Sequence, residues 1–324
     1  MATVAPETLE TAPAGPPDSD VVGLSPRQLF WARFKQDKAA FVGLAVIAFL
    51  ALIAILAPVI SSLVGHGPNE IFREMTDSFG LPKGPNGDFL FGADQAGRDV
   101  FVRVVYGART SLTVGLVATG IAVVIGTILG LTAGFFGGKL DTIISRSIDV
   151  ILSIPILLFA IGIVAACNAT AEGCVNGLIK PGLTLVIAVI AVFTWPYIAR
   201  IVRGNTLSLR EKEFVESARS VGAGNMRIMF REILPNLVAP IIVYSTLLIP
   251  SNILFEAGLS FLGLGVPQST PSWGRMLSDA ASGNLFQYAP WMMIFPGLFL
   301  VLTTLSFNLL GDGLRDALDP RSNR

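Results

Sequence analysis

The sequence has few of the side chains with which enzymes do chemistry. Its 324 residues include one histidine and two cysteines. Metal sites need several such ligands, and a nucleophilic serine or cysteine needs a nearby base. His66 stands alone, so no Cys/His cluster has metal-ligand spacing and no Ser/His/Asp set is available. The sequence therefore predicts no metal site, no catalytic residues and no enzyme activity.

A nucleotide-binding loop is also missing. Gly137-Gly138-Lys139 looks like the end of a phosphate loop, but Ala133 stands where the leading glycine belongs and Leu140 where Ser or Thr belongs. The segment is predicted to be a tight cytoplasmic turn instead. We expect this chain to bind no cofactor, so the energy for any pumping must come from other subunits.

Charged residues are scarce, and long uncharged runs take their place. Only 14% of the residues are charged, against about 25% in soluble domains. A helix needs about 20 mostly uncharged residues to cross about 30 Å of hydrocarbon. The sequence predicts an all-α, polytopic membrane helix bundle with a kink at Pro155 and with about six spans, at residues 41–63, 111–133, 147–169, 182–199, 237–257 and 290–310.

The ends of the chain differ from the membrane part in composition. Residues 1–24 are rich in Ala, Pro and Thr, carry only acidic charges and are predicted to be a disordered tail. They lack the basic start of a secretory signal peptide. We expect a cytoplasmic pre-span segment at 25–40, a transmembrane domain at 41–310 and a cytoplasmic C-terminal tail at 311–324.

The positive charges indicate the orientation. Most of the 23 Lys and Arg residues fall in segments that are cytoplasmic if the N-terminus is inside, and cytoplasmic loops carry the excess of basic residues. The richest of these segments is the loop at 200–236. An even number of spans keeps Arg315, Arg321 and Arg324 on the same side, so both termini are predicted to be cytoplasmic.

Small residues and cysteines suggest how the spans are held. Gly126, Gly130 and Gly134 recur every four residues in the second span and would let another helix approach closely, although glycine is common in membrane helices generally. Cys167 and Cys174 fall in one outer loop, where an oxidising compartment allows a disulfide. Two free thiols are the alternative.

Ionisable residues are almost absent from the spans. Ion-coupled transporters place such residues at mid-membrane, whereas Asp149 lies near a cytoplasmic end and Glu256 near the outer end of the fifth span. This argues against a proton or sodium antiporter. Glu256 could cap a helix, pair with an arginine or face the pathway, and a structural role is the favoured interpretation.

The large basic loop has a helix–glycine–helix outline. Phe214, Ala218 and Val221 share one helical face, and Gly222 ends that helix. A second helical segment follows, and Pro235 is expected to mark the turn into the fifth span. An amphipathic linker on anionic lipid and a DNA-reading helix-turn-helix share this outline. The tethering between two spans and the glutamates of the loop argue against DNA, and we expect no nucleic acid partner.

Within this loop the sequence resembles a known family. Glu216-Ser-Ala-x-x-x-Gly222, followed by Ile233-Leu-Pro235, looks like the EAA loop of permease subunits of ABC importers. In that family the short helix is the coupling helix, which seats in a groove of the cytoplasmic ATPase subunit. The resemblance implies that the residues at this contact are Glu216, Ser217, Ala218, Gly222, Ala223, Leu234 and Pro235.

Further segments resemble the C-type permease of the peptide and nickel branch of that family, and the similarity covers about residues 25–321. One of them is an outer-loop motif with Gly97, Arg98, Asp99, Arg103, Tyr106 and Arg109. We expect its charged side chains to be exposed and to place the loop, through ion pairs of about 0–1 kcal/mol each or through headgroups. Contact with substrate or a binding protein is the alternative. Trp273 and Trp291 are expected to anchor at the membrane interface.

The resemblance implies a function and a set of partners. The fold would be the transmembrane domain of a type I ABC importer, multi-pass in the bacterial cytoplasmic (inner) membrane. The chain would work with a second, dissimilar permease subunit, with one or two ATPase subunits that hold ATP and Mg²⁺, and with an extracytoplasmic solute-binding protein. Dipeptides or oligopeptides are the expected cargo, and nickel chelates or another small solute the alternative. The rival from another class is a channel or scaffold subunit without a motor.

Overall fold

The structure, a computed structural model, describes residues 25–169, 174, 177 and 179–318. Within these ranges the chain is helical, and β pairing is limited to isolated bridges. The predicted tail at 1–24 and the last residues of the C-terminal tail lie outside the described residues. The elements are α1 (Pro26–Gln36), α2 (Lys38–Val64), η1 (Arg73–Met75), α3 (Val100–Phe136), α4 (Gly138–Ser153), α5 (Ile156–Asn168), α6 (Leu183–Leu209), α7 (Glu213–Ser220), α8 (Asn225–Arg227), η2 (Ile228–Ile233), α9 (Leu234–Phe261), α10 (Trp273–Ala281), η3 (Ser282–Gln287) and α11 (Trp291–Leu318).

Five helices in the described part of the chain are long and apolar enough to cross a membrane. They are α2, α3, α6, α11 and the continuous helix Asn225–Phe261. α4 and α5, which meet at an angle of 86°, are together long and apolar enough for a sixth crossing if the bent pair forms one span. The bend falls at Pro155, whose ring forces the preceding residue out of the helical region. The expected kink is therefore confirmed, but a third span confined to 147–169 is wrong, because its first arm already begins at Gly138.

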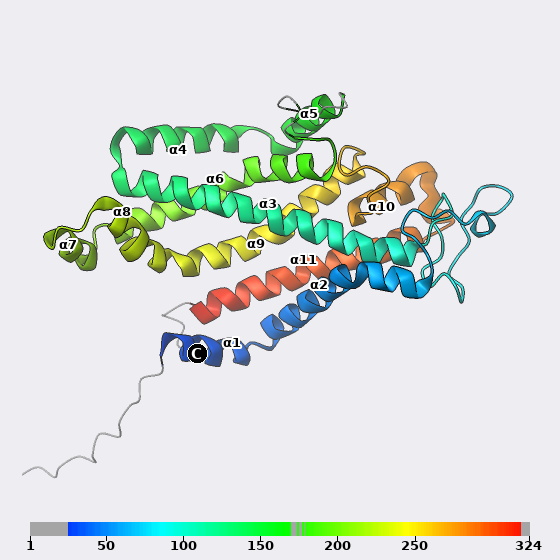
Figure 1. Cartoon of the computed structure of the whole chain (residues 1–324), viewed down its shortest axis with the longest axis horizontal. Helices are drawn as coiled ribbons and strands as arrows, with labels where there is room; N and C mark the ends of the chain where they lie inside the picture. The colour runs from blue at the N-terminus through cyan, green and yellow to red at the C-terminus, as the bar shows by residue number, and fades with distance from the viewer. Residues whose placement is uncertain (1–24, 170–173, 175–176, 178, 319–324) are drawn as a thin grey trace, which may run out of the picture.

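The long helices run side by side along one axis of the molecule, as Figure 1 shows. α3 lies against α6, α9 and α2, and α11 lies against α2 and α9. The predicted small-residue face of α3 is confirmed. A Cβ atom added at Gly130 would lie 2.5 Å from the Ala199 carbonyl oxygen, and one at Gly134 would lie 2.6 Å from Thr206 Cβ. Glycine at these positions allows α3 and α6 to approach closely.

The turn between α3 and α4 is the one predicted from Gly137 and Gly138. Both residues have positive φ, +65° and +56°. Glycine adopts this left-handed conformation without steric cost. The apparent phosphate-loop ending is therefore a helix–helix connection.

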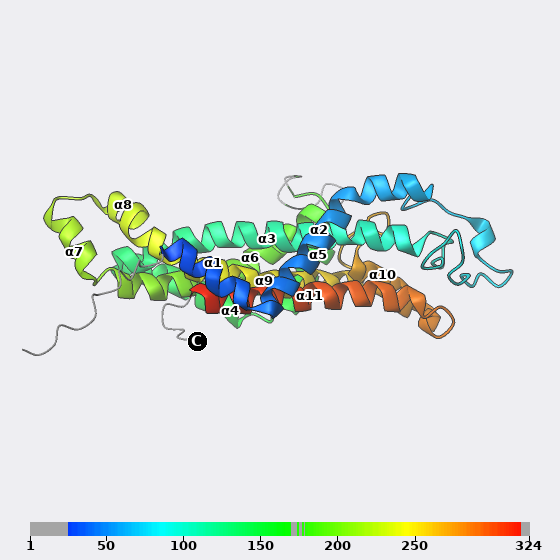
Figure 2. The same ribbon diagram turned by 90° about the horizontal axis from the view of Figure 1, so that it is seen from below.

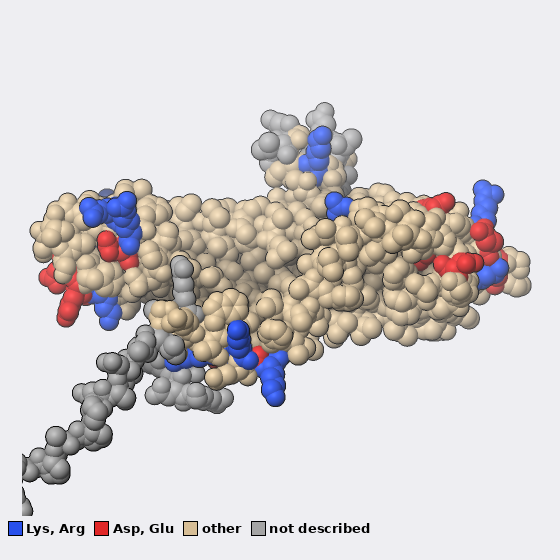
Figure 3. All heavy atoms as spheres, turned by 60° about the horizontal axis from the view of Figure 1, so that its bottom comes forward, with Lys and Arg blue, Asp and Glu red and all other residues tan. Residues whose placement is uncertain are grey.

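In Figure 3 most acidic side chains lie toward the two ends of the long axis, several basic ones also lie between them, and the rest of the surface between the ends is uncharged. At the cytoplasmic end lie α7 and α8, and at the outer end lie α10 and the loops between α2 and α3 (Figure 2). Within the predicted cytoplasmic segment at 200–236, α6 continues to Leu209 and a helix resumes at Asn225. Likewise, most of the expected tail from 311 is the end of α11, which reaches Leu318.

Candidate functional site

The cytoplasmic loop is firmly attached to the bundle. Val215 of α7 is fully buried and packs in one cluster with Ile228 and Ile233 of the following helix and with Phe135 of α3. Gly222 closes the turn after α7 with a φ of +78°, a conformation that glycine favours. The loop is therefore packed onto the ends of α3 and α9.

Four large apolar side chains of the same loop face outward. We call Phe214, Val221, Met226 and Phe230 the coupling patch; they are 37%, 83%, 64% and 45% exposed. The helical face predicted from the sequence is divided, since Ala218 packs against the buried cluster while the first two patch residues do not. The loop projects beyond the bundle (Figure 2). An exposed apolar patch rimmed by polar residues marks an interaction site.

The family-matching residues of the loop fall into two groups. Glu216 and Ser217 are exposed on α7 next to the coupling patch, whereas Ala223 is half-buried and donates its N–H to the Ala218 carbonyl at 3.0 Å. Leu234 and Pro235 lie farther along, in the first turn of α9. Leu234 nevertheless packs against the same buried cluster as Ala218 and Ala223, whereas Glu216 and Ser217 lie exposed outside it.

The expected turn at Pro235 is wrong. Residues Ile228–Ile233 form a π-helix that runs directly into α9, so the backbone stays helical through the proline. In a π-helix each N–H bonds the carbonyl five residues back, so the pairing differs from that of an α-helix just before a residue that has no N–H.

Two arginines at the cytoplasmic end bind neighbouring helices. Arg203 of α6 forms a bidentate ion pair with Asp141 of α4, with Nη2 2.8 Å from Oδ2. Arg210 donates from Nη1 to the Gly134 carbonyl at 3.0 Å. These basic residues therefore hold helix ends together in addition to setting the orientation.

The outer-loop motif is buried, contrary to the prediction of exposed pairs. Arg98, Asp99 and Arg103 are 8%, 1% and 0% exposed. Asp94 lies between the two arginines, 2.7 Å from Arg98 Nε and 3.5 Å from Arg103 Nε. Asp279 of α10 adds a carboxylate 3.6 Å from Arg98 Nη2. Since burial disfavours the charged form, it raises the pKa of the Asp279 carboxyl above its ordinary value.

This network joins segments that are far apart in the sequence. Arg103 donates to the carbonyls of Pro68, at 3.0 Å, and Gln268, at 3.5 Å. Asp99 caps α3 by accepting the Phe101 N–H at 2.8 Å and lies 2.6 Å from His66 Nδ1. The loops before α3 and after α9 are thus tied to one helix end, and together with α10 we call them the outer cap.

The remaining motif residues have separate places. Gly97 has a φ of +79° and lies so close to Phe72 that a Cβ would be 2.5 Å from its carbonyl oxygen. Tyr106 is half-buried, and Arg109 is exposed on α3 in a groove beside α2. The motif therefore contains one buried network and two residues outside it.

Both tryptophans expected at the membrane interface donate hydrogen bonds to the backbone of the outer end of the molecule. Trp273 is fully buried, so interfacial anchoring is wrong for it. It donates Nε1–H to the Val104 carbonyl at 3.1 Å and lies over Gly107. Trp291 donates to the Ala93 carbonyl at 2.9 Å.

Two buried polar residues tie α9 to its neighbours. Glu256 is fully buried and accepts from Ser111 Oγ at 3.2 Å and from Ser260 Oγ at 2.7 Å, which gives it the structural role that was favoured. Asn252 accepts from Thr194 Oγ1 at 3.0 Å and donates to Thr119 Oγ1 at 2.8 Å. The sequence did not predict this role for Asn252, because a single polar residue within an apolar run forms no recognisable motif.

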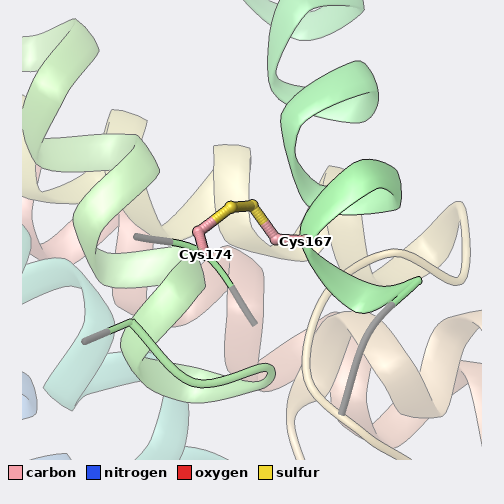
Figure 4. Close-up of a disulfide and its surroundings, with 2 residues drawn as sticks. All are labelled: Cys167 and Cys174. Carbon is pink, nitrogen blue, oxygen red and sulfur yellow. A yellow bond between two sulfur atoms is a disulfide. The ribbon is translucent and has the colours of Figure 1, made fainter. Parts of the chain in front are cut away.

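The two cysteines form a disulfide between the end of α5 and the loop that follows (Figure 4). Their Cα atoms are 5.0 Å apart. Cys174 also exchanges two backbone hydrogen bonds with Ile179, at 2.9 and 3.2 Å. Together these bonds close the short outer connection between α5 and α6.

Five to six apolar helices in the described residues, with an apolar loop patch at one end, define a multi-pass membrane protein. The family of binding-protein-dependent transport system inner membrane components matches residues 126–324, and the N-terminal TM domain of oligopeptide transport permease C matches residues 25–79. The chain therefore belongs to the family of inner membrane components of binding-protein-dependent transport systems, and it is a multi-pass protein of the bacterial inner membrane.

Individual relatives cover nearly the whole chain. It is 43% identical over 306 residues to the dipeptide transport system permease protein DppC of Alkalihalophilus pseudofirmus, covering 94% of this chain and 93% of the relative. It is 42% identical to the glutathione transport system permease protein GsiD of Escherichia coli, covering 92% and 91%. A chain of the inward-facing MetNI methionine ABC transporter shares the fold, with a TM-score of 0.54, 20% identity, and coverage of 67% of this chain and 96% of that one.

Proposed function

We propose that this chain forms half of the translocation pathway of an ATP-driven importer for dipeptides and oligopeptides. The named cargoes of its relatives support this choice, because dipeptides and glutathione, a tripeptide, are all short peptides. The observation that carries the importer mechanism is the coupling patch, an exposed apolar surface on a loop that is fixed to the pathway helices.

Four kinds of partner complete the proposed machine. A second, dissimilar permease subunit supplies the other half of the pathway. One or two ATPase subunits hold ATP and Mg²⁺ and carry out hydrolysis, and the coupling patch seats in them. An extracytoplasmic solute-binding protein delivers the cargo to the outer cap. The lipid bilayer surrounds the uncharged band of the bundle.

The geometry suggests how motion would pass from the ATPases to the pathway. Closure of the ATPases displaces α7, whose Val215 is locked against Ile228 and Ile233. Those residues belong to the helix that continues as α9, so the displacement enters α9 directly. Asn252 and Glu256 tie α9 to α3 and α6, and these helices therefore move with it.

Glu216→Lys and Gly222→Pro test the coupling proposal. The first reverses a charge beside the coupling patch, and the second demands a φ near −65° at a residue whose φ is +78°. We expect uptake of a labelled dipeptide to be lost, while membrane insertion and binding of the solute-binding protein persist. Gly224→Ala is the matched control, because that residue has a φ of −70° and no neighbour within 4 Å.

Two results would contradict the proposal. Unchanged uptake in both variants would remove the coupling role from the loop. Dipeptide flux through the assembled permease in the absence of ATP would instead support the channel without a motor.

A further inference from the structure

A cavity of about 300 Å³ opens between α5, α6 and α9. Thr194 and Tyr197 of α6 face Ser251 and Asn252 of α9 across it, and Ile156 lies at its edge, directly after the bend at Pro155. Ligand pockets start at about this volume. The lining here would be half of a larger space if a second subunit closed it.

The exposed polar groups of this surface set it apart from the lipid-facing part of the bundle. On α11 the exposed residues Leu298, Val301 and Leu305 are all apolar, as contact with lipid tails requires. In the cavity, Tyr197 is 48% exposed and Ser251 is also exposed. Polar side chains in a membrane span face the bundle interior or a water-filled space. The other lining residues, Ile156, Ile190, Leu248 and Phe255, are apolar, so this surface offers a solute two exposed hydroxyls on an otherwise apolar wall.

The polar groups are held in place but carry no charge. Asn252 is fixed by its hydrogen bonds to Thr194 and Thr119, so the edge of the amide keeps its orientation. The hydroxyls of Ser251 and Tyr197 can both donate and accept. Hydroxyls match the N–H and C=O groups of a peptide backbone, which every short peptide presents regardless of its side chains.

We propose that Tyr197 and Ser251 line the translocation pathway and hydrogen-bond the backbone of a passing peptide, while the buried Asn252 holds α9 in place behind them. This inference rests on the proposed import function and assigns that function a place in the chain. The absence of charge from the lining fits a transient site, because a pathway must bind its solute weakly enough to release it. Selection among peptides then lies outside this surface.

Thiol labelling tests whether the surface is wet. Cys167 and Cys174 are bonded to each other, so a Ser251→Cys variant of the assembled importer presents a new thiol without competition from them. We expect a charged, water-soluble maleimide to label this thiol and ADP-vanadate trapping to change the labelling rate. The control is Val301→Cys on α11, which should react only with a lipid-soluble maleimide. Labelling of Ser251→Cys by the lipid-soluble reagent alone, or by neither reagent, would overturn the proposal.

A transport measurement tests whether the peptide passes this point. Ser251→Trp should lower labelled-dipeptide uptake about tenfold or more by filling the narrow space, while Val301→Trp leaves it unchanged. ATP hydrolysis stimulated by the loaded binding protein should persist in Ser251→Trp, which separates a blocked pathway from lost coupling. Normal uptake in Ser251→Trp would overturn the inference and leave the importer function intact. Failure of the unmodified importer to carry any dipeptide would instead refute the proposed function.

Discussion

The two ends of the bundle are held together by different forces. The outer cap is organised around buried charges, in which Asp94, Arg98, Arg103 and Asp279 contact one another away from water. The cytoplasmic loop is organised around a buried apolar cluster centred on Val215, and its remaining apolar side chains are left outside. The outer cap therefore buries charged side chains, whereas the cytoplasmic loop exposes four large apolar side chains.

This difference matches the demands on each end. Buried ion pairs require closely defined geometry. The outer cap is therefore a preformed surface. An exposed apolar patch marks an interaction site, and the proposed function assigns this patch to contact with another protein. The variants below separate these two arrangements, from the largest expected effect to the smallest.

Arg103→Met should have the largest effect. It keeps much of the side-chain volume but takes a cation from the buried carboxylates and a donor from the carbonyls of Pro68 and Gln268. Removing one partner of a buried pair costs about 3–5 kcal/mol. We expect a clearly lower Tm for the purified chain in detergent. Arg73→Ala, at an exposed position of the same outer region, is the control. Equal Tm values for the two variants would show that the outer network does not hold the cap.

Ile233→Ala should weaken only the cytoplasmic end. The side chain is fully buried in the cluster around Val215, and such a truncation costs about 2–5 kcal/mol. Hydrogen exchange should show faster opening of α7, with unchanged protection of the outer cap. Equal loosening of both ends would mean that the two arrangements are not independent.

Replacing Cys167 and Cys174 together by serine should cost about 2–3 kcal/mol, because the disulfide closes a short loop. The measurement is the Tm of the native chain with and without a reducing agent. The double-serine chain serves as the control, since the reagent should not affect it. A native Tm that does not respond to reduction would argue that the loop is held by its backbone bonds to Ile179 alone.

Val221→Asp should change stability least. The side chain is 83% exposed, so the free energy of unfolding should stay within about 0.5 kcal/mol. Binding of the ATPase subunit should nevertheless weaken about tenfold, which is about 1.4 kcal/mol. Val215→Asp, which places the same charge at the buried position of α7, should unfold the loop and lose both properties. Unchanged ATPase affinity in Val221→Asp would mean that the coupling patch is not the docking surface.

The membrane part of the fold could be predicted from the sequence. A membrane-spanning helix needs about 20 mostly uncharged residues, and such runs can be recognised in the sequence directly. The ends of the spans could not be predicted. α6, for example, ends at Leu209, beyond the predicted end of the fourth span at residue 199. Hydropathy cannot locate a helix end outside the apolar run. Pro155 predicted a kink, but no local rule predicts the angle of 86° between the two helices.

The sites show the same limit. A resemblance located the coupling loop, yet the eight residues of α7 were too few for periodicity to choose Val215 over Phe214 as the buried anchor. The charges of the outer-loop motif were expected in water because α10, which covers them, arrives much later in the chain. Burial that depends on distant segments cannot be read from neighbouring residues.

The continuous helix from Asn225 to Phe261 also determines how far a tilt at one end displaces the other end. Its 37 residues span about 55 Å at about 1.5 Å per residue. If a helix of that length tilted as one body, a tilt of about 5° about one end would move the other end by about 5 Å. A modest push at the membrane surface would then be enough to open or shut an aperture near the opposite face. The π-helix near the driven end is the place where that stroke could be softened.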